Sequence, residues 1–211
     1  GRAVRILLLD FRKAFDLVDH KILLTKMSNA GIPKFLLKWC HSFLKDRHQR
    51  IKIGKTTSSW SHIKAGVPQG TLLGPTCFIL HINDLKMLNR SVKYVDDTTI
   101  YESCSYTGTD STLQTSADQA IEWSDKNNMS INADKTIVYY GLKPHNLHPI
   151  TVKGQSVSRV AHFKLLGVHF NDKLTWHHHV EAICEKASNR LFSLVLLRRA
   201  GKPPQDLLDV Y

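Results

Sequence analysis

Two adjacent carboxylates, Asp96 and Asp97, stand between short segments rich in β-branched and aromatic residues. Such segments favour strands, and aspartate tolerates the backbone angles of a tight turn, so residues 91–101 are predicted to form a hairpin with both carboxylates at its tip. The two charges repel by up to roughly 4 kcal/mol at about 4 Å in a partly screened site. A cation between them would offset that cost, although a solvated Asp-Asp turn is the commoner arrangement.

A third carboxylate, Asp10, follows an apolar run at residues 4–9 that is typical of a buried strand. If this strand shares a sheet with the hairpin, Asp10 comes close to Asp96 and Asp97. Carboxylate oxygens suit Mg²⁺, which also keeps waters and binds substrate phosphates. Two such ions about 3.5–4 Å apart activate an attacking hydroxyl and stabilise a leaving oxygen, so the expected chemistry is phosphoryl transfer.

The remaining patterns supply the elements that must position these residues. Helical periodicity and end signals predict helices at 19–30, 33–46, 74–88, 111–128 and 176–199. Alternating patterns and turn residues predict a strand at 137–140, hairpins at 49–63 and about Gly154, and a bent strand pair at 163–170. Between the second and third helices, Gly66–Gly70 forms a rigid loop that a ligand can approach closely.

Composition points to a polyanionic partner, because 29 Lys and Arg against 18 Asp and Glu leave a formal charge of +11. Nucleic acid or an acidic membrane surface would fit. Four widely spaced cysteines favour a reducing, intracellular compartment. No apolar run reaches about 18 residues, so no membrane span is expected. The chain opens directly into an apolar run without an initiator Met, which favours a piece of a longer polypeptide.

Five segments follow one another in a characteristic order: Leu9–His20, Gly66–Pro75, Tyr94–Asp97, Asn132–Thr136 and Phe163–Val168. In that order they resemble motifs A to E of reverse transcriptases, most closely those of non-LTR, LINE-like retrotransposons. The resemblance covers nearly the whole chain, and five ordered motifs are far more specific than any one of them.

The resemblance implies an α+β fold with three parts. Residues 1–160 would form a palm, an antiparallel sheet backed by helices; residues 161–174 a primer-grip hairpin; and residues 175–211 the start of a helical thumb. The fingers segment that precedes motif A in this family, and an endonuclease domain, are expected to be missing. For the parent element, the family implies an intracellular location in the nucleus and in cytoplasmic ribonucleoprotein.

The implied activity is RNA-templated DNA synthesis, with an RNA template, a DNA primer, dNTPs and two Mg²⁺ ions, for which Mn²⁺ is an alternative. The resemblance makes Asp10, Asp96 and Asp97 both catalytic and metal-binding. It also makes Lys135 a catalytic lysine that helps protonate the leaving pyrophosphate, although a solvated lysine is nearly as good an interpretation. Asp19 is better explained as a helix cap and Asp84 as an acceptor for neighbouring backbone groups.

Two further sets of residues match substrate-binding positions of the family. The nucleotide-binding set is Phe11, Arg12, Phe15, Gln69 and Gly70. The primer-binding set is Phe163, Leu165, Leu166 and Gly167. Phe15 would pack under the deoxyribose and exclude a 2′-hydroxyl, or else be an ordinary core residue. Basic residues of the helix after Trp176 would contact phosphates or simply face solvent.

Two competing hypotheses remain open. The first is a catalytically inactive remnant that binds nucleic acid only, through its positive charge. The second is a two-metal nuclease, which also needs clustered carboxylates but does not explain the Gly66–Gly70 loop or Phe15. If the chain is a polymerase fragment, we expect it to be weakly active at best when isolated.

Overall fold

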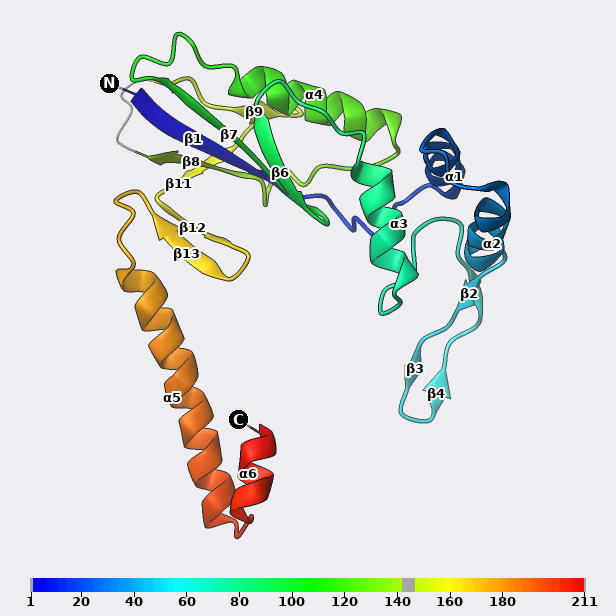
Figure 1. The fold of residues 1–211 in the computed structure, drawn as a ribbon, viewed down its shortest axis with the longest axis vertical. Coiled ribbons are helices and arrows are strands. Elements are labelled where there is room, and N and C mark those ends of the chain that lie inside the picture. The colour runs from blue at the N-terminus through cyan, green and yellow to red at the C-terminus, as the bar shows by residue number, and fades with distance from the viewer. Residues whose placement is uncertain (1, 142–146, 211) are drawn as a thin grey trace. The chain divides into compact units, whose positions relative to one another are not determined.

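The computed structural model describes residues 2–141 and 147–210, and the chain divides into two compact units, Gly1–Arg159 and Val160–Tyr211. A five-stranded sheet of order β11-β8-β1-β7-β6 organises the larger unit (Figure 1). Its strands are β1 (Arg2–Leu9), β6 (Arg90–Tyr94), β7 (Asp97–Ser105), β8 (Ile137–Gly141) and β11 (Ser158–Val160). β1 pairs antiparallel with both β7 and β8, and β6 pairs antiparallel with β7.

Helices and short hairpins make up the rest of the larger unit. The helices are α1 (His20–Asn29), α2 (Lys34–Leu44), α3 (Leu73–Ile82) and α4 (Leu113–Lys126). One hairpin consists of β2 (His48–Gln49), β3 (Lys52–Ile53), β4 (Thr56–Thr57) and β5 (Ser61–His62), and another of β9 (Thr151–Val152) and β10 (Gln155–Ser156). The predicted α+β architecture, an antiparallel sheet backed by helices, is confirmed. Within the described ranges, no helix is long and apolar enough to cross a membrane.

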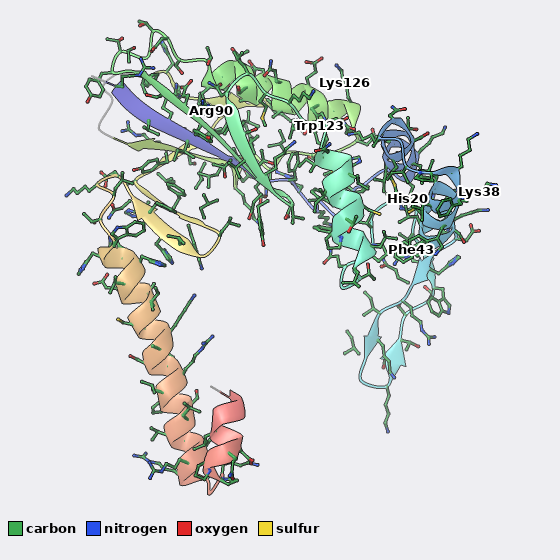
Figure 2. The ribbon with its side chains drawn as sticks, in the orientation of Figure 1. His20, Lys38, Phe43, Arg90, Trp123 and Lys126 are labelled. Carbon is green, nitrogen blue, oxygen red and sulfur yellow. The ribbon has the colours of Figure 1, made fainter. Side chains whose placement is uncertain are left out.

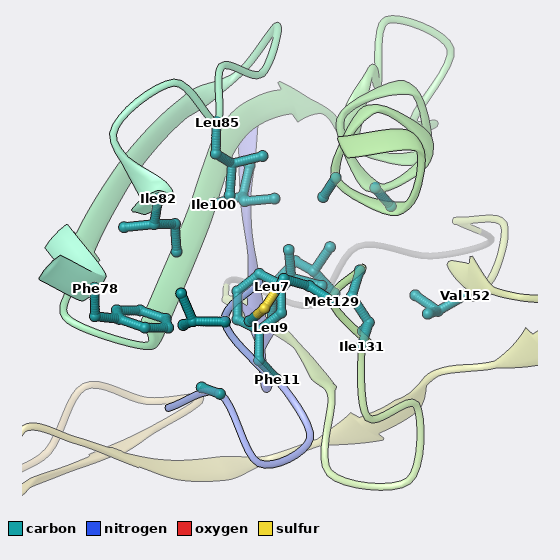
Figure 3. Close-up of a cluster of buried hydrophobic side chains, with 14 of the residues drawn as sticks. Leu7, Leu9, Phe11, Phe78, Ile82, Leu85, Ile100, Met129, Ile131 and Val152 are labelled. Carbon is teal, nitrogen blue, oxygen red and sulfur yellow. The ribbon is translucent and has the colours of Figure 1, made fainter. Parts of the chain in front are cut away.

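The core lies on the side of the sheet to which β1 turns every second residue. Leu7 and Leu9 of β1 are buried there, together with Ile100 of β7 and Phe78 of α3 (Figure 3). Burying one such side chain contributes roughly 1.5–3 kcal/mol. A register shift of one residue would turn Leu7 and Leu9 to the other face of the sheet, so the pairing of β1 is strongly specified.

Arg5 is also buried within β1, which an apolar run does not predict. It lies opposite Glu102 of β7, with Arg5 Nη1 3.5 Å from Glu102 Oε1. The Ser111 hydroxyl joins them, accepting from Arg5 Nη1 at 2.6 Å and donating to Glu102 Oε1 at 2.5 Å. Separating a buried pair leaves an uncompensated charge at a cost of about 3–5 kcal/mol. The ion pair therefore opposes a shift of β1 against β7.

The helix predicted to run from Gly74 to Leu88 ends as α3 at Ile82. Lys93 of β6 explains the early end. Its ammonium donates to the carbonyl groups of Ile82, Asn83 and Leu85, at 3.1, 3.2 and 3.0 Å. A lysine that binds the last carbonyls stabilises a helix end, and this one lies on a different element.

Asp19 caps α1 as predicted, since its carboxylate accepts from the backbone N–H groups of Lys21 and Ile22. Asp84, for which backbone partners are predicted, instead binds two side chains from other helices. Its Oδ1 accepts from Lys26 Nζ of α1 at 2.6 Å and from Trp123 Nε1 of α4 at 2.9 Å. Trp123 is labelled in Figure 2. Asp84 thus ties the end of α3 to α1 and α4.

The smaller unit contains the hairpin β12 (His162–Leu165) and β13 (Val168–Asn171), followed by α5 (His177–Arg199) and α6 (Pro204–Val210). The predicted bend at Gly167 is a two-residue turn in which Leu166 and Gly167 have φ values of 47° and 89°. α6 is not predicted, because Pro203 and Pro204 are read as the end of the regular structure. Pro204 instead begins a helix, a position that suits its fixed φ and missing N–H.

His81 of α3 is fully buried, and neither of its ring nitrogens has a hydrogen-bond partner in the described part of the chain. Burial, reinforced by the nearby Lys26 ammonium, lowers the pKa of His81 from 6.5 to about 4. The folded chain therefore holds this imidazole neutral at a pH where an exposed histidine is charged.

Acid is accordingly expected to destabilise the fold through His81. The unfolded chain takes up a proton near pH 6.5 and the folded chain only near pH 4. The free energy of unfolding should fall by on the order of 3 kcal/mol across that interval and be unaffected by this group above it. Chemical denaturation at several pH values measures the fall. His81→Leu should remove it and His41→Leu, on the exposed part of α2, should keep it; equal pH dependence in both variants would contradict the assignment.

Candidate active site

The pairing of β1 with β7 brings Asp10 to the hairpin tip. Leu9 lies opposite Thr98, so the next residue of each strand places Asp10 beside Asp97. Tyr94 pairs with Asp97, which leaves Val95 and Asp96 as the two-residue turn between β6 and β7. Partial burial and the charges of Asp96 and Asp10 raise the pKa of Asp97. The three carboxylates are therefore electrostatic neighbours, as their order along the chain suggests.

The hairpin tip is strained at Val95, whose φ is 58°. A two-residue hairpin with a left-handed first position normally takes glycine there, and a β-branched residue pays roughly 1–2 kcal/mol. The Val95 side chain packs against the hydrophobic core, which offsets part of that cost. The strained turn holds Asp96 at the extreme tip, and strain of this kind is concentrated at functional sites.

A cleft of about 930 Å³ opens beside the tip. Seven of the predicted site residues line it: Asp10, Phe11, Arg12, Phe15, Gln69, Asp96 and Lys135. Asp97 and Gly70 are outside this lining, although each is next in sequence to a residue that belongs to it. The cleft therefore gathers residues from β1, the loop before α3, the β6–β7 turn and the segment before β8.

The donor chemistry of this cluster fits Mg²⁺, because oxygen-only carboxylates are the ligands of that ion. Burial, and after it the charges of Asp96 and Asp10, raise the pKa of Asp97, and a bound cation would relieve the part that comes from those charges. Across residues 2–141 and 147–210, however, no three His, Cys, Asp or Glu side chains are arranged to hold a metal ion. The carboxylates thus form an acidic cluster rather than a closed metal cage.

Asn132 orients Asp10 and is absent from the predicted site. Its Nδ2 donates to Asp10 Oδ2 at 3.0 Å, and its backbone N–H donates to the Asp10 carbonyl at 2.7 Å. Phe11 and Ile131 form an adjacent β-bridge. The one clue to this role in the sequence is that Asn132 is the first residue of the motif D segment. Its partner lies 122 residues away in sequence, which one sequence does not show.

The Gly66–Gly70 loop is attached to the segment that follows Asp10. Gly66 N–H donates to Val18 O and Val67 N–H donates to Phe15 O, both at 2.8 Å. The His20 ring Nε2 lies 2.7 Å from Gly66 O, at the start of α1 (Figure 2). These contacts set the position from which the loop presents its next residues to the cleft.

Gln69 is held by Asp16, because its Nε2 donates to Asp16 Oδ1 at 3.2 Å. A carboxylate only accepts, so it fixes the amide with Nε2 toward Asp16 and leaves Oε1 for another partner. Phe15 borders the cleft and also stacks on Phe78, with ring centroids 4.9 Å apart. It is therefore part of the core edge and of the cleft wall at once.

The other substrate-binding candidates are placed as follows. Arg12 pairs with Asp134 at 3.1 Å, and both side chains are largely exposed. Lys135 lies on the exposed rim of the cleft. The primer-binding candidates all belong to the β12–β13 hairpin of the smaller unit: Phe163, Leu165, Leu166 and Gly167. Their roles stay predictions.

Comparison with known proteins identifies the family. Residues 1–170 match the family model described as reverse transcriptase (RNA-dependent DNA polymerase). The chain belongs to the reverse transcriptase family. It is 31% identical over 196 residues to the RNA-directed DNA polymerase from mobile element jockey of Drosophila funebris, covering 87% of this chain and 21% of that protein. The chain thus spans about a fifth of that reverse transcriptase, and the predicted retrotransposon relationship is confirmed.

Other similarities agree with this assignment. The chain is 33% identical over 85 residues to the Pol polyprotein from the type-1 retrotransposable element R2 of Popillia japonica, covering 40% of this chain and 14% of that protein. Apo telomerase from Candida tropicalis, truncated from its C-terminal domain, gives a TM-score of 0.57 at 17% identity over 82% of this chain and 35% of the telomerase chain. This last similarity shows the reverse transcriptase fold alone.

The electrostatic coupling of the three carboxylates can be tested without substrate. In Asp10→Asn and in Asp96→Asn, the pKa of Asp97 should fall because one neighbouring negative charge is gone. Carbon NMR of labelled aspartate carboxyl groups measures that pKa. Asp118→Asn, on the exposed face of α4, should leave it unchanged; an unaltered Asp97 titration in the first two variants would show that the carboxylates are not neighbours.

The attachment of the loop can be tested at its two glycines. A Cβ at Gly66 would lie 2.8 Å from Asp16 O, whereas one at Gly70 would meet nothing within 4 Å, and both glycines have positive φ. Gly70→Ala should cost about 1 kcal/mol from backbone strain. Gly66→Ala adds a main-chain clash and should cost about 2 kcal/mol or more in denaturant unfolding. Equal losses would mean that the loop is not packed against Asp16.

Proposed function

We propose that this chain carries the active-site part of an RNA-directed DNA polymerase that extends a DNA primer on an RNA template. One observation carries the proposal: in a chain of the reverse transcriptase family, Asp10 and Asp96 line the same cleft as Phe15 and Gln69. A carboxylate pair suits phosphoryl transfer, and the two other residues supply a wall for a nucleotide. A nuclease would need the carboxylates but not that wall.

Asp10 and Asp96, with Asp97 as a further or orienting carboxylate, would hold Mg²⁺, or Mn²⁺ in its place. When bound, two such ions activate the primer 3′-hydroxyl and neutralise charge on the departing pyrophosphate. Asn132 keeps the Asp10 carboxylate in a fixed orientation through its hydrogen bond. Because burial and the charges of Asp96 and Asp10 raise the pKa of Asp97, acidification should protonate this carboxylate and weaken metal binding through it.

The remaining cleft residues act on the nucleotide. Phe15, which stacks on Phe78, would lie under the deoxyribose and exclude a 2′-hydroxyl. Gln69, oriented by Asp16, presents its amide oxygen to the nucleotide. Lys135 on the rim donates a proton toward the leaving pyrophosphate.

Primer binding is assigned to the β12–β13 hairpin and the basic residues of α5. The exposed Leu166 at the turn would contact the growing end of the primer, at a position with left-handed φ. Lysine and arginine side chains of α5 would contact phosphates, an interaction that weakens as salt is added. For the parent element, we propose a location in the nucleus and in cytoplasmic ribonucleoprotein.

A second candidate function is nucleic-acid binding without catalysis. It is favoured by the formal charge of +11. It predicts salt-dependent RNA binding with no Mg²⁺-dependent incorporation of dNTPs.

Primer extension on an RNA template separates the two functions. Within the full-length polypeptide, the chain should incorporate dNTPs in a Mg²⁺-dependent reaction that chelation stops. Asp96→Asn should lower the rate about 10³-fold, the several kcal/mol that a metal ion contributes to such a step. Asp118→Asn serves as the matched control and should extend like the unaltered protein. Undiminished extension by Asp96→Asn would exclude the proposed mechanism, and absent extension by the unaltered protein would favour the second candidate.

A further inference from the structure

Most of the net positive charge of the chain is concentrated between the first and second motifs. Residues 34–64 contain eight Lys and Arg but one acidic residue, Asp46, and so hold seven of the eleven net charges. Among the residues that the structure describes, Lys45 alone of these eight has a carboxylate within 4.0 Å, that of Asp46 at 3.5 Å. Basic side chains without acidic partners are available for phosphates.

Part of this charge lines a second hollow, of about 660 Å³, in the larger unit. Arg47, His62 and Lys64 lie along it, at the base of the β2–β5 hairpin. Three residues line both this hollow and the candidate active-site cleft: Lys13, Leu17 and Gln69. The two hollows therefore adjoin.

The hairpin that rises from this hollow carries an exposed aromatic ring. The β2–β5 hairpin projects from the larger unit beyond α2 (Figure 1). Trp60 is 61% exposed, and the Arg50 guanidinium carbon lies 4.6 Å from the centre of its ring. Ile51 and Ile53 on the opposite arm are also exposed. The Arg50 guanidinium thus stacks over the Trp60 ring, and an exposed aromatic ring with cationic groups around it is the usual platform for an unpaired base.

We propose that the β2–β5 hairpin and the hollow at its base bind single-stranded RNA, with phosphates along Arg47 and Lys64 and a base stacked on Trp60. The identification of this RNA as the template strand outside the active-site cleft rests on the proposed polymerase function; the binding itself does not. A protein partner is the less favoured occupant, because the surface combines a basic hollow, an exposed aromatic ring and a position next to the cleft.

The test uses residues 1–211 and a fluorescent oligouridylate of about 20 nucleotides, longer than the roughly 4–16 nucleotides that single-strand binding folds cover. Anisotropy at several salt concentrations gives the dependence of log affinity on log salt. The double variant Arg47→Gln, Lys64→Gln should reduce the magnitude of that slope by about 1.4, or roughly 0.7 for each phosphate that is no longer neutralised. Trp60→Ala should weaken binding roughly tenfold and Trp60→Phe far less, since phenylalanine keeps a stacking face.

The matched control is Lys86→Gln, Arg90→Gln, which removes the same charge from exposed positions of the same unit. Arg90 begins β6, at the end away from the Val95–Asp96 turn (Figure 2). The control should keep the slope of the unaltered protein, and circular dichroism should show that every variant folds. The proposal is overturned if the unaltered chain does not bind the RNA, if the hairpin variants bind like it, or if the control lowers the slope equally.

Asp96→Asn separates this proposal from the polymerase function, because it should bind RNA normally while losing primer extension. If the hairpin variants bind RNA unchanged and Asp96 is still required for extension, the RNA site is wrong and the polymerase function stands. If the hairpin variants lose RNA binding and Asp96→Asn extends primers normally, the RNA site stands and the catalytic assignment fails.

Discussion

The alignment of β1 with β7 is the constraint on which the candidate site depends. A strand exchanges its two faces when it shifts by one residue, so alternating burial and the Arg5–Glu102 ion pair each oppose a shift. These contacts lie along the strands, away from the carboxylates. They nevertheless place Asp10 beside Asp97, because Leu9 and Thr98, the last paired residues, belong to the same register. The strand pairing that stabilises the sheet thus also fixes the position of the Asp10 carboxylate.

The pairing of β1 with β7 also supports two features that are unfavourable by themselves. The tip of the β6–β7 hairpin carries a valine in a left-handed conformation and crowds three carboxylates. Each feature costs free energy, and neither would form in an isolated hairpin, which is marginally stable in water. β1 pairs with β7 from Thr98 to Ser105, and β7 pairs with β6, so the paired strands hold the tip in place.

The catalytic candidates were predictable because their chemistry depends on residue type and on local order along the chain. Asp10 after a strand, Asp96 and Asp97 in a turn and Gln69 in a glycine-flanked loop are local patterns, and the structure brings Asp10, Asp96 and Gln69 into one cleft. Several features that sequence reasoning missed depend on distant partners. Asn132 reaches Asp10 across 122 residues, Lys26 reaches Asp84 across 58, and the partner that neutralises Arg5 is on another strand. Helix periodicity likewise continues past Ile82, and Lys93, from the following strand, shows why α3 stops there.

The wall shared by the two hollows has a thermodynamic consequence. Lys13, Leu17 and Gln69 face both, so a ligand that immobilises these side chains from one side changes what the other side offers. Such coupling is reciprocal: whatever factor the occupant of the basic hollow applies to nucleotide affinity in the cleft, the nucleotide applies to that occupant. Asp16, which holds Gln69 and lines the basic hollow, is the point through which this linkage would pass. Because the two hollows share these lining residues, occupation of one proposed site would change the affinity of the other.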